Sequence, residues 1–205
     1  MLPRPSVQRA PNVWDRFYHA QQAPWRGARP VAPFLDLPQP MLELGCGNGK
    51  TLLPLRQAGI DAIGLDISWN IISRLPEAGI LGDIRALPFA DESFGTVLDL
   101  HCSGHLRNAD RLQALSEIRR IIKPGGIVVL ERLAEDDLRA SQGTASGEMR
   151  RLEDGRETIF LSLEALQKEA ETAGFAVADV DEDLRHPSHR GTKIRRHMYR
   201  LWLQA

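Results

Sequence analysis

Short apolar runs alternate with helix-period runs between Pro40 and about Leu133, a pattern typical of β-α-β units and a parallel sheet. Between residues 110 and 123 the apolar positions have the spacing of an amphipathic helix. We therefore predict an α/β fold with a doubly wound, mostly parallel sheet and helices on both faces. The expected strands are 41–44, 61–65, 79–81, 94–100 and 126–130.

The C-terminal part of the chain continues this pattern with one interruption. Residues 135–155 are rich in small polar side chains, and we expect a surface loop there. Leu163–Ala173 predicts a helix that Gly174 ends. Two extended runs follow, at 175–181 and 197–203, and we expect them to pair antiparallel at the edge of the sheet.

The N-terminal residues differ in composition from the rest. Eight of the 13 prolines lie within the first 40 residues, which leaves few free N–H groups for regular ladders. We predict a proline-rich arm or lid at 1–39 and one domain at 40–205. Aromatic residues in the arm indicate that it folds back onto the domain. Tyr18 is a candidate substrate contact, and Trp14 and Phe17 are expected beside it or in the core.

The overall composition is that of an ordinary globular chain, with 42% hydrophobic residues, 26% charged residues and a formal net charge of −1. This balance excludes a whole-chain attraction to nucleic acid or anionic lipid, and we expect no DNA partner. No apolar run approaches the ~18 residues that a membrane-spanning helix needs. The N-terminus lacks the apolar block of a secretory signal, and two cysteines form no disulfide framework, which favours a reducing, cytoplasmic setting.

Three glycines at alternate positions follow the first expected strand, in the segment Glu43-Leu44-Gly45-Cys46-Gly47-Asn48-Gly49. They let the backbone turn sharply and approach a ligand at the sheet edge where doubly wound folds bind ligands. The spacing G-x-G-x-G differs from the dinucleotide fingerprint G-x-G-x-x-G, so the ligand need not carry phosphate. Pro54 places the start of the next helix near Thr51.

Two carboxylates lie at the ends of the next two expected strands. Asp66 comes 17 residues after Gly49, where a carboxylate can accept both hydroxyls of a ribose. Asp83 ends the third strand, where it can accept from an adenine amine while Ile84 covers a ring face. A turn aspartate is the alternative for Asp83. Together these strand-end features predict a nucleoside pocket.

Four strings in this order, LELGCGNG, GLDIS, GDIRALPFADESFGTV and EIRRIIKPGG, resemble the class I S-adenosylmethionine-dependent methyltransferases, in particular those of ubiquinone and menaquinone biosynthesis. The resemblance covers residues 41–132. It implies a seven-stranded sheet of order 3-2-1-4-5-7-6 with strand 7 antiparallel. It also implies S-adenosyl-L-methionine as the cofactor and S-adenosyl-L-homocysteine as the product.

The resemblance assigns the cofactor to the glycine loop and the strand ends, with the methionine part on residues 43–49 and the ribose on Asp66. In the arm, Trp25 and Arg26 are candidates to close over the methionine end, with the guanidinium pairing its carboxylate. An aromatic residue that only pins the arm is the alternative. The expected contacts on the domain are Glu43, Gly45, Cys46, Gly47, Asn48, Gly49, Asp66, Ile67, Asp83, Ile84 and Leu100.

In this family, the segment after the fourth strand approaches the reacting methyl group, and here it contains His101 and His105. Both are candidate general bases, because a near-neutral imidazole can take a proton from a hydroxyl, amine or thiol. Many relatives have a paired histidine where this chain has Gly104-His105, and positioning alone can carry much of the acceleration. The alternative is a histidine that only shapes the loop. We expect no nucleophilic role for Cys102 and no metal site.

Residues 185–200 contain six Lys/Arg, three histidines and no carboxylate. This composition predicts a positive rim for a small anionic acceptor, with Arg190 and Arg195 as candidate contacts. Protection of an edge strand is the alternative.

RNA is a second acceptor class, since GCGNGK is also similar to the cofactor loop of eukaryotic-type wobble-uridine tRNA methyltransferases. The neutral chain charge favours the small molecule. A cofactor-binding protein without catalysis and a nicotinamide-dependent oxidoreductase are further alternatives.

Overall fold

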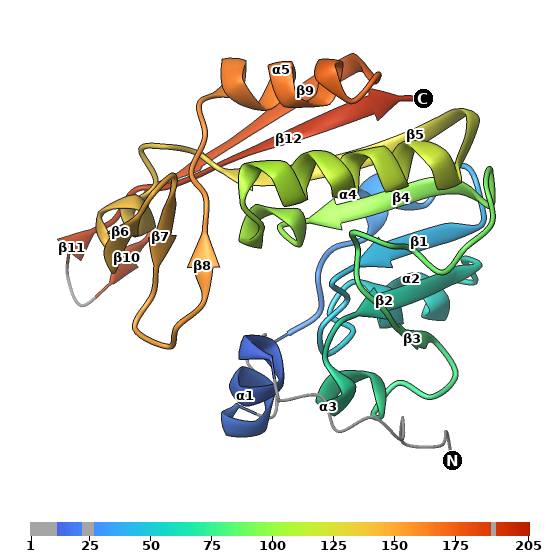
Figure 1. Cartoon of the computed structure of the whole chain (residues 1–205), viewed down its shortest axis with the longest axis horizontal. Coiled ribbons are helices and arrows are strands. Elements are labelled where there is room, and N and C mark those ends of the chain that lie inside the picture. The colour runs from blue at the N-terminus through green and yellow to red at the C-terminus, as the bar shows by residue number, and fades with distance from the viewer. Residues whose placement is uncertain (1–11, 22–26, 190–191) are drawn as a thin grey trace.

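A seven-stranded sheet forms the centre of the computed structural model, which describes residues 12–21, 27–189 and 192–205 (Figure 1). Its order is β3-β2-β1-β4-β5-β12-β9, or 3-2-1-4-5-7-6 in chain order. The first five strands run parallel, and β12 runs antiparallel to both of its neighbours. The predicted fold class and strand order are confirmed. The strands are β1 Met41–Leu44, β2 Ala62–Asp66, β3 Gly79–Leu81, β4 Phe94–Leu100, β5 Ile122–Leu133, β9 Ala176–Arg185 and β12 Arg196–Gln204.

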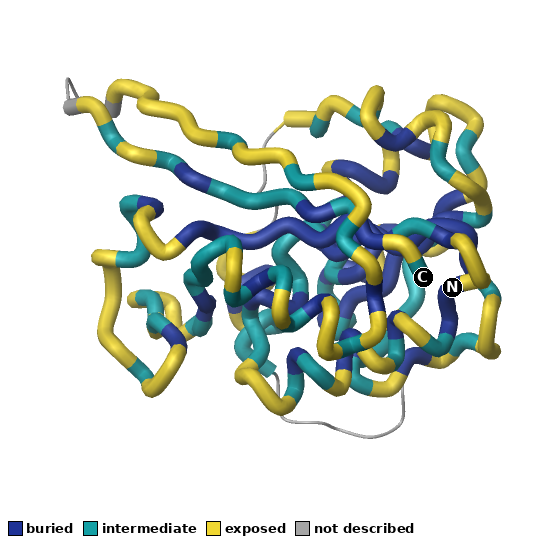
Figure 2. The backbone as a smooth tube through the Cα atoms, turned by 90° about the horizontal axis from the view of Figure 1, so that it is seen from above, coloured by how far each residue is buried: buried dark blue, intermediate teal, exposed yellow. Residues whose placement is uncertain are grey.

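Side chains alternate between two apolar clusters along the central strands. On β1, Met41 belongs to one cluster and Leu42 to the other, and on β4 Leu98 and Val97 divide in the same way. This is the period-2 alternation of a strand with both faces buried. Figure 2 shows the central strands among the most deeply buried parts of the backbone.

Helices cover both faces of the sheet (Figure 1). α4 (Asn108–Ile121) and α5 (Leu163–Thr172) pack on one face, and α2 (Leu52–Gln57) and α3 (Trp69–Ile72) on the other. The helix α2 begins directly after Thr51, as the position of Pro54 predicted. Within the described ranges, no helix has both the length and the apolar character needed to cross a membrane.

The described part of the arm lies against the domain. Helix α1 (Val13–Ala20) is capped by Asn12, buries Phe17 and Tyr18, and lies beside α3 in Figure 1. A short 3-10 helix, η1 (Ala32–Phe34), follows it. The arm therefore folds back as expected, while its separation from the domain at residue 39 stays a prediction.

The surface loop expected at 135–155 is wrong for about half of its length, because short elements form within it. After the 3-10 helix η3 (Leu138–Ser141), a three-stranded antiparallel sheet forms from β6 (Thr144–Ser146), β7 (Met149–Arg151) and β8 (Glu157–Thr158). Met149 of this small sheet is buried. The strand β8 lies beyond the small polar stretch that suggested a loop. A two-stranded ribbon of β10 (Ser188–His189) and β11 (Thr192–Lys193) extends the β9–β12 pair.

Candidate active site

The glycine loop after β1 adopts a backbone that favours glycine. Gly45, Gly47 and Gly49 have φ of +61°, +51° and +77°. A Cβ on Gly45 would also lie 2.6 Å from the sulfur of Cys102, in the loop after β4. The spacing of the glycines therefore serves both a left-handed turn and a close approach to the neighbouring strand end.

Asp66 joins the end of β2 to this loop. Its Oδ2 accepts a hydrogen bond from the Gly47 amide at 3.0 Å, and its Oδ1 accepts from the Ser68 amide at 2.9 Å. Burial raises the pKa of Asp66 from 3.8 to about 6 against the effect of these hydrogen bonds. Each carboxylate oxygen has a further lone pair, so Asp66 can still accept from ligand hydroxyls.

Glu43 lies at the start of the loop with an unsatisfied oxygen. Burial raises its pKa from 4.5 to about 8, although the Thr51 hydroxyl and the Leu52 amide both hydrogen-bond to it. Among the described residues, its buried Oε2 has no hydrogen-bond partner. Such an atom is costly to bury alone, and a cationic group of a ligand would satisfy it.

The carboxylate of Asp83, which follows the third strand, is less available to a ligand than the sequence suggested. Arg85 donates to both oxygens of Asp83, from Nε at 3.0 Å to Oδ1 and from Nη2 at 2.6 Å to Oδ2. Ile84 is buried and belongs to an apolar cluster. A contact between Asp83 and an adenine amine would therefore add to an existing ion pair, and it stays a prediction.

The remaining predicted cofactor contacts lie around the same edge. Cys46 is buried, and burial raises the pKa of its thiol well above the usual value, as it does for Cys102. The carbonyl of Ile67 accepts from Asn12 of the arm at 3.3 Å. Leu100 packs against the cluster that contains Leu98. Trp25 and Arg26 lie outside the described residues.

A buried ion pair holds the loop after β4. Arg132 and Asp99 are almost fully buried, with Nη2 of Arg132 2.9 Å from Oδ2 of Asp99. The Ser103 amide donates to Asp99 at 3.0 Å, and the Ser103 hydroxyl contacts both side chains. These bonds fix the backbone that carries His101 and His105.

His101 sits in a strained conformation at the tip of β4. Its φ of +78° is uncommon for a residue with a side chain, and such strain is often found at functional sites. Its Nε2 lies 3.6 Å from the buried carboxylate of Glu131, which also pairs with Arg29 and with Arg200. Burial lowers the pKa of His101 below its usual value, so the ring is neutral near pH 7.

His105 lies in the 3-10 helix η2 (Ser103–His105) and has a defined tautomer. Its Nδ1 is 2.6 Å from the carbonyl oxygen of Glu157. Because a carbonyl oxygen can only accept, Nδ1 must carry the proton and Nε2 the lone pair. Burial lowers the pKa of His105 to about 4, so this tautomer persists at neutral pH.

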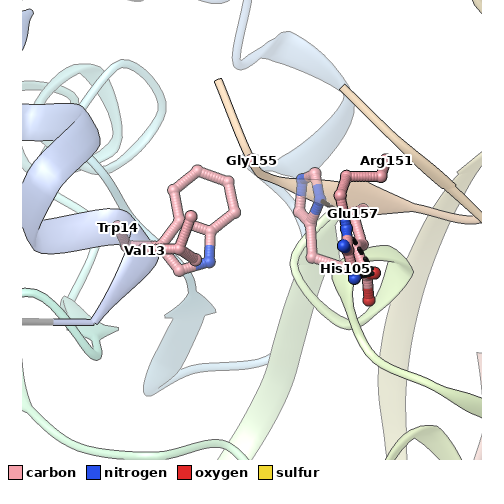
Figure 3. Close-up of a pocket in the computed structure, with 6 residues that line it drawn as sticks. All are labelled: Val13, Trp14, His105, Arg151, Gly155 and Glu157. Atoms are coloured by element: carbon pink, nitrogen blue, oxygen red, sulfur yellow. Dashed lines mark hydrogen bonds and ion pairs between the residues drawn. The ribbon is translucent and has the colours of Figure 1, made fainter. Parts of the chain in front are cut away.

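A cavity of about 330 Å³ opens beside His105 (Figure 3). Trp14 of α1 forms one side, with its ring centroid 4.7 Å from that of His105. The other side comes from the β6–β8 sheet, where Arg151 and Glu157 form a 2.7 Å ion pair. The lining residues are Val13, Trp14, His105, Arg151, Gly155 and Glu157.

Sequence reasoning placed some of these residues and missed others. Tyr18 is buried in the core, and Trp14, considered beside it, lines the cavity instead. Arg151 and Glu157 were missed, because their segment was interpreted as a loop and its continuation. The role of Tyr18 as a substrate contact stays a prediction.

The arginines of the 185–200 window pair with carboxylates that the fold brings to them. The count over one window omitted these acids, so each arginine of the window that the structure describes is paired rather than free. Arg195 as an acceptor contact stays a prediction, and Arg190 lies outside the described residues. The pairs are Arg185–Asp183, Arg195–Asp136, Arg196–Asp137 and Arg200–Glu131.

Comparison with known proteins agrees with this geometry. A family model described as a methyltransferase domain matches residues 42–130, the part that holds the glycine loop, Asp66 and the loop after β4. Through these residues the chain is similar to the class I S-adenosylmethionine-dependent methyltransferases. This methyltransferase domain confirms the resemblance drawn from the four sequence strings.

Curated relatives of the methyltransferase domain act on different acceptors. The demethylmenaquinone methyltransferase of Renibacterium salmoninarum is 39% identical over 98 residues, which are 45% of this chain and 40% of that protein. The tRNA U34 carboxymethyltransferase of Azotobacter vinelandii is 33% identical over 165 residues, which are 74% of this chain and 50% of that protein. This chain thus spans half or less of either relative's own length.

A solved structure shares the fold over nearly the whole chain. It is the Burkholderia thailandensis 1,6-didemethyltoxoflavin-N1-methyltransferase with bound 1,6-didemethyltoxoflavin and S-adenosylhomocysteine. The TM-score is 0.69 at 16% identity, and the match covers 98% of this chain and 93% of that one.

The family's cofactor, S-adenosylmethionine, fits the residues at this edge of the sheet. Gly45 and Gly47 turn the backbone at positive φ and add no side chain of their own where the methionine part would lie. The unsatisfied Oε2 of Glu43 suits its ammonium group, and Asp66 suits the ribose hydroxyls. The individual contacts stay predictions.

Proposed function

We propose that the protein is an S-adenosylmethionine-dependent methyltransferase whose acceptor is a small molecule bound in the cavity that Trp14 and His105 line. One observation carries the proposal. The short loop after β4 contacts the glycine loop at one end, through Cys102 and Gly45, and lines the cavity at the other, through His105. A cofactor on the glycine loop and an acceptor in the cavity would therefore both lie against the loop after β4, one at each end of it.

The cofactor, when bound, supplies a methyl group on a sulfonium. Transfer breaks the carbon–sulfur bond with its electron pair left on sulfur and forms a bond from an acceptor lone pair to the methyl carbon. The chain has to hold the acceptor in line and to exclude water. Trp14 and the β6–β8 sheet flank the acceptor on two sides for this purpose.

His105 orients the acceptor. Its Nδ1 is held by the Glu157 carbonyl, which leaves the lone pair of Nε2 to accept a hydrogen bond from an O–H or N–H group. The low pKa of His105 makes it a weak base that is unprotonated across pH 6–8. The acceptor proton passes to Nε2 as the new bond forms, and from there to water.

The size of the cavity favours a small acceptor. A volume of about 330 Å³ is at the lower end of the ~300–1,000 Å³ typical of ligand pockets. A second candidate is RNA, which the tRNA-modifying relative from Azotobacter vinelandii supports because it matches 74% of this chain. The paired arginines of β9 and β12 favour the small molecule over RNA.

The test is transfer of a labelled methyl group to defined fractions. The full chain is incubated with methyl-labelled S-adenosylmethionine and either a small-metabolite extract or bulk tRNA, with Asp66→Ala as the control for cofactor dependence. We expect label in a small-molecule product only. Label in tRNA alone would replace the small acceptor with RNA, and label in neither fraction, from a folded sample, would argue against the proposed activity.

A further inference from the structure

The cavity between α1 and the β6–β8 sheet has one aromatic wall and one cationic wall. Trp14 supplies the aromatic wall from the arm. Arg151 and Glu157 face it from the β6–β8 sheet (Figure 3). The two walls come from parts of the chain outside residues 42–130, so they differ in origin from the cofactor loop.

The indole of Trp14 is held in one orientation. The Arg156 guanidinium lies 5.4 Å from the Trp14 ring centroid and 4.0 Å from that of Phe17. Phe17 and His105 both pack edge-to-face with Trp14, at centroid distances of 5.8 and 4.7 Å. A fixed indole is a preformed surface for a planar ring, because little conformational freedom is lost on stacking.

The charges around Glu157 leave a positive surplus. Its carboxylate accepts from Arg107 at 2.9 Å, from Arg151 at 2.7 Å and from the Ser146 hydroxyl at 2.8 Å. Two guanidinium groups thus share one carboxylate. The remaining charged neighbour, Arg156, pairs with Asp154 at 2.7 Å.

Arg151 is the guanidinium that can turn to a ligand. It lines the cavity and its side chain is 56% exposed. If Arg151 left Glu157, the carboxylate would keep Arg107 and Ser146, so no buried charge would lose its partners. A ligand anion can therefore engage Arg151 at low cost, whereas a cationic ligand would meet the positive surplus.

We propose that the acceptor is a planar aromatic acid, stacked on Trp14 with its carboxylate on Arg151 and its O–H or N–H directed to His105. This inference rests on the proposed function and names the substrate class of that site. It moves anion recognition from the β9–β12 region, whose described arginines do not line the cavity, to Arg151 on β7, which does. Arg151 is then the residue that determines specificity for the acid.

Three probes that differ mainly in charge test the inference: 4-hydroxyphenylacetate, its neutral amide and the cationic amine tyramine. Dissociation constants are measured by ligand-observed NMR titration of the full chain saturated with S-adenosylhomocysteine. We expect the acid to bind at least about tenfold more tightly than the amide, the range of one charge-assisted hydrogen bond, and the amine to bind most weakly. Hexanoate, which lacks the ring, should bind more weakly than the aromatic acid.

Two variants assign the effect to Arg151. Arg151→Gln should remove the preference for the acid over the amide, while Arg150→Gln should keep it, because neighbouring side chains on β7 point to opposite faces. Glu157→Gln leaves the backbone carbonyl that holds His105 in place and should keep or strengthen acid binding. Equal affinity for all three charges, or an unchanged preference in Arg151→Gln, would overturn the inference.

The same titration separates this inference from the proposed function. Saturation with S-adenosylhomocysteine is verified first by calorimetry. If that ligand binds but the acid shows no preference, the substrate class is wrong and the proposed methyltransferase stands. If S-adenosylhomocysteine does not bind to the folded protein, the proposed function fails, and the inference fails with it.

Discussion

Arg132 and Asp99 form an ion pair behind the loop after β4, with 2% and 0% of their side chains exposed. Asp99 also accepts from the Ser103 amide at 3.0 Å, so the pair links β4 and β5 to the first residue of η2. A charge at such depth is tolerated only with its partner present. The position of His105 therefore depends on a buried contact behind the loop.

Arg132→Met should destabilise the protein by about 3–5 kcal/mol, because it leaves the Asp99 carboxylate buried without its cation. Urea denaturation measures the free energy of unfolding. The double variant Arg132→Met with Asp99→Asn should recover part of the loss. Arg185→Gln, which breaks an exposed pair with Asp183, is the control, with an expected change below about 0.5 kcal/mol. An equal loss of unfolding free energy in Arg132→Met and in Arg185→Gln would contradict the account.

The raised pKa of Glu43 predicts a contribution to folding stability that decreases as pH rises, the opposite of what a paired carboxylate contributes. Its folded pKa of about 8 exceeds the usual 4.5, so above pH 4.5 the folded state holds a proton that the unfolded state has lost. The contribution of Glu43 to stability should therefore fall as pH rises from about 5 to 8. Asp66, raised to about 6, acts in the same direction, whereas His101 and His105, lowered to about 4, act in the opposite direction below about pH 6.5. Glu43→Gln should remove this contribution, which changes the stability difference between variant and wild type by about 3 kcal/mol between pH 5 and pH 7.

Thermal or urea unfolding of ligand-free Glu43→Gln and wild type across pH 5–8 measures this difference. Asp61→Asn, an exposed carboxylate before β2, serves as the control and should follow the wild-type curve. Parallel curves for Glu43→Gln and wild type would show that Glu43 titrates normally in the folded state.

His105 predicts a flat pH profile. With a pKa of about 4, the His105 ring does not change charge between pH 6 and 8. Any ionisation seen in the pH profile of kcat/KM over this range should therefore also be present in His105→Asn. The variant should lower kcat by about 10²-fold and leave the affinity for S-adenosylhomocysteine unchanged. NMR titration of the ring should give a midpoint below pH 5. A midpoint near 6.5 would instead make His105 an ordinary exposed histidine.

Local patterns predicted the parts of the site that depend on one segment at a time. The alternation of apolar runs indicated the parallel sheet, and the glycine spacing with Asp66 predicted a nucleoside pocket at its edge. Both signals are contained in a short stretch of chain, which explains why the parallel strands and the glycine turn were found, whereas the strand order followed from the family resemblance.

The cavity could not be predicted in the same way, since Trp14, His105 and Glu157 come from three distant segments. The pairing of β7 with β8 depends on backbone hydrogen bonds, and residue types alone give little indication of which strands form them. The basic window 185–200 was misjudged for a related reason. Its neutralising acids, such as Asp136 and Asp137, lie far from it in sequence and next to it in the fold.

The most direct test of the account is calorimetric titration of S-adenosylhomocysteine into wild type, Asp66→Ala and Asp61→Ala. Asp66→Ala should weaken binding by at least about tenfold, because the ribose hydroxyls lose a charged acceptor. Asp61→Ala, which changes an exposed residue before the same strand, should bind like wild type. Asp66→Asn repeats the test with the shape of the side chain kept. Unchanged affinity in both Asp66 variants would contradict the central claim that the ends of β1 and β2 hold the cofactor.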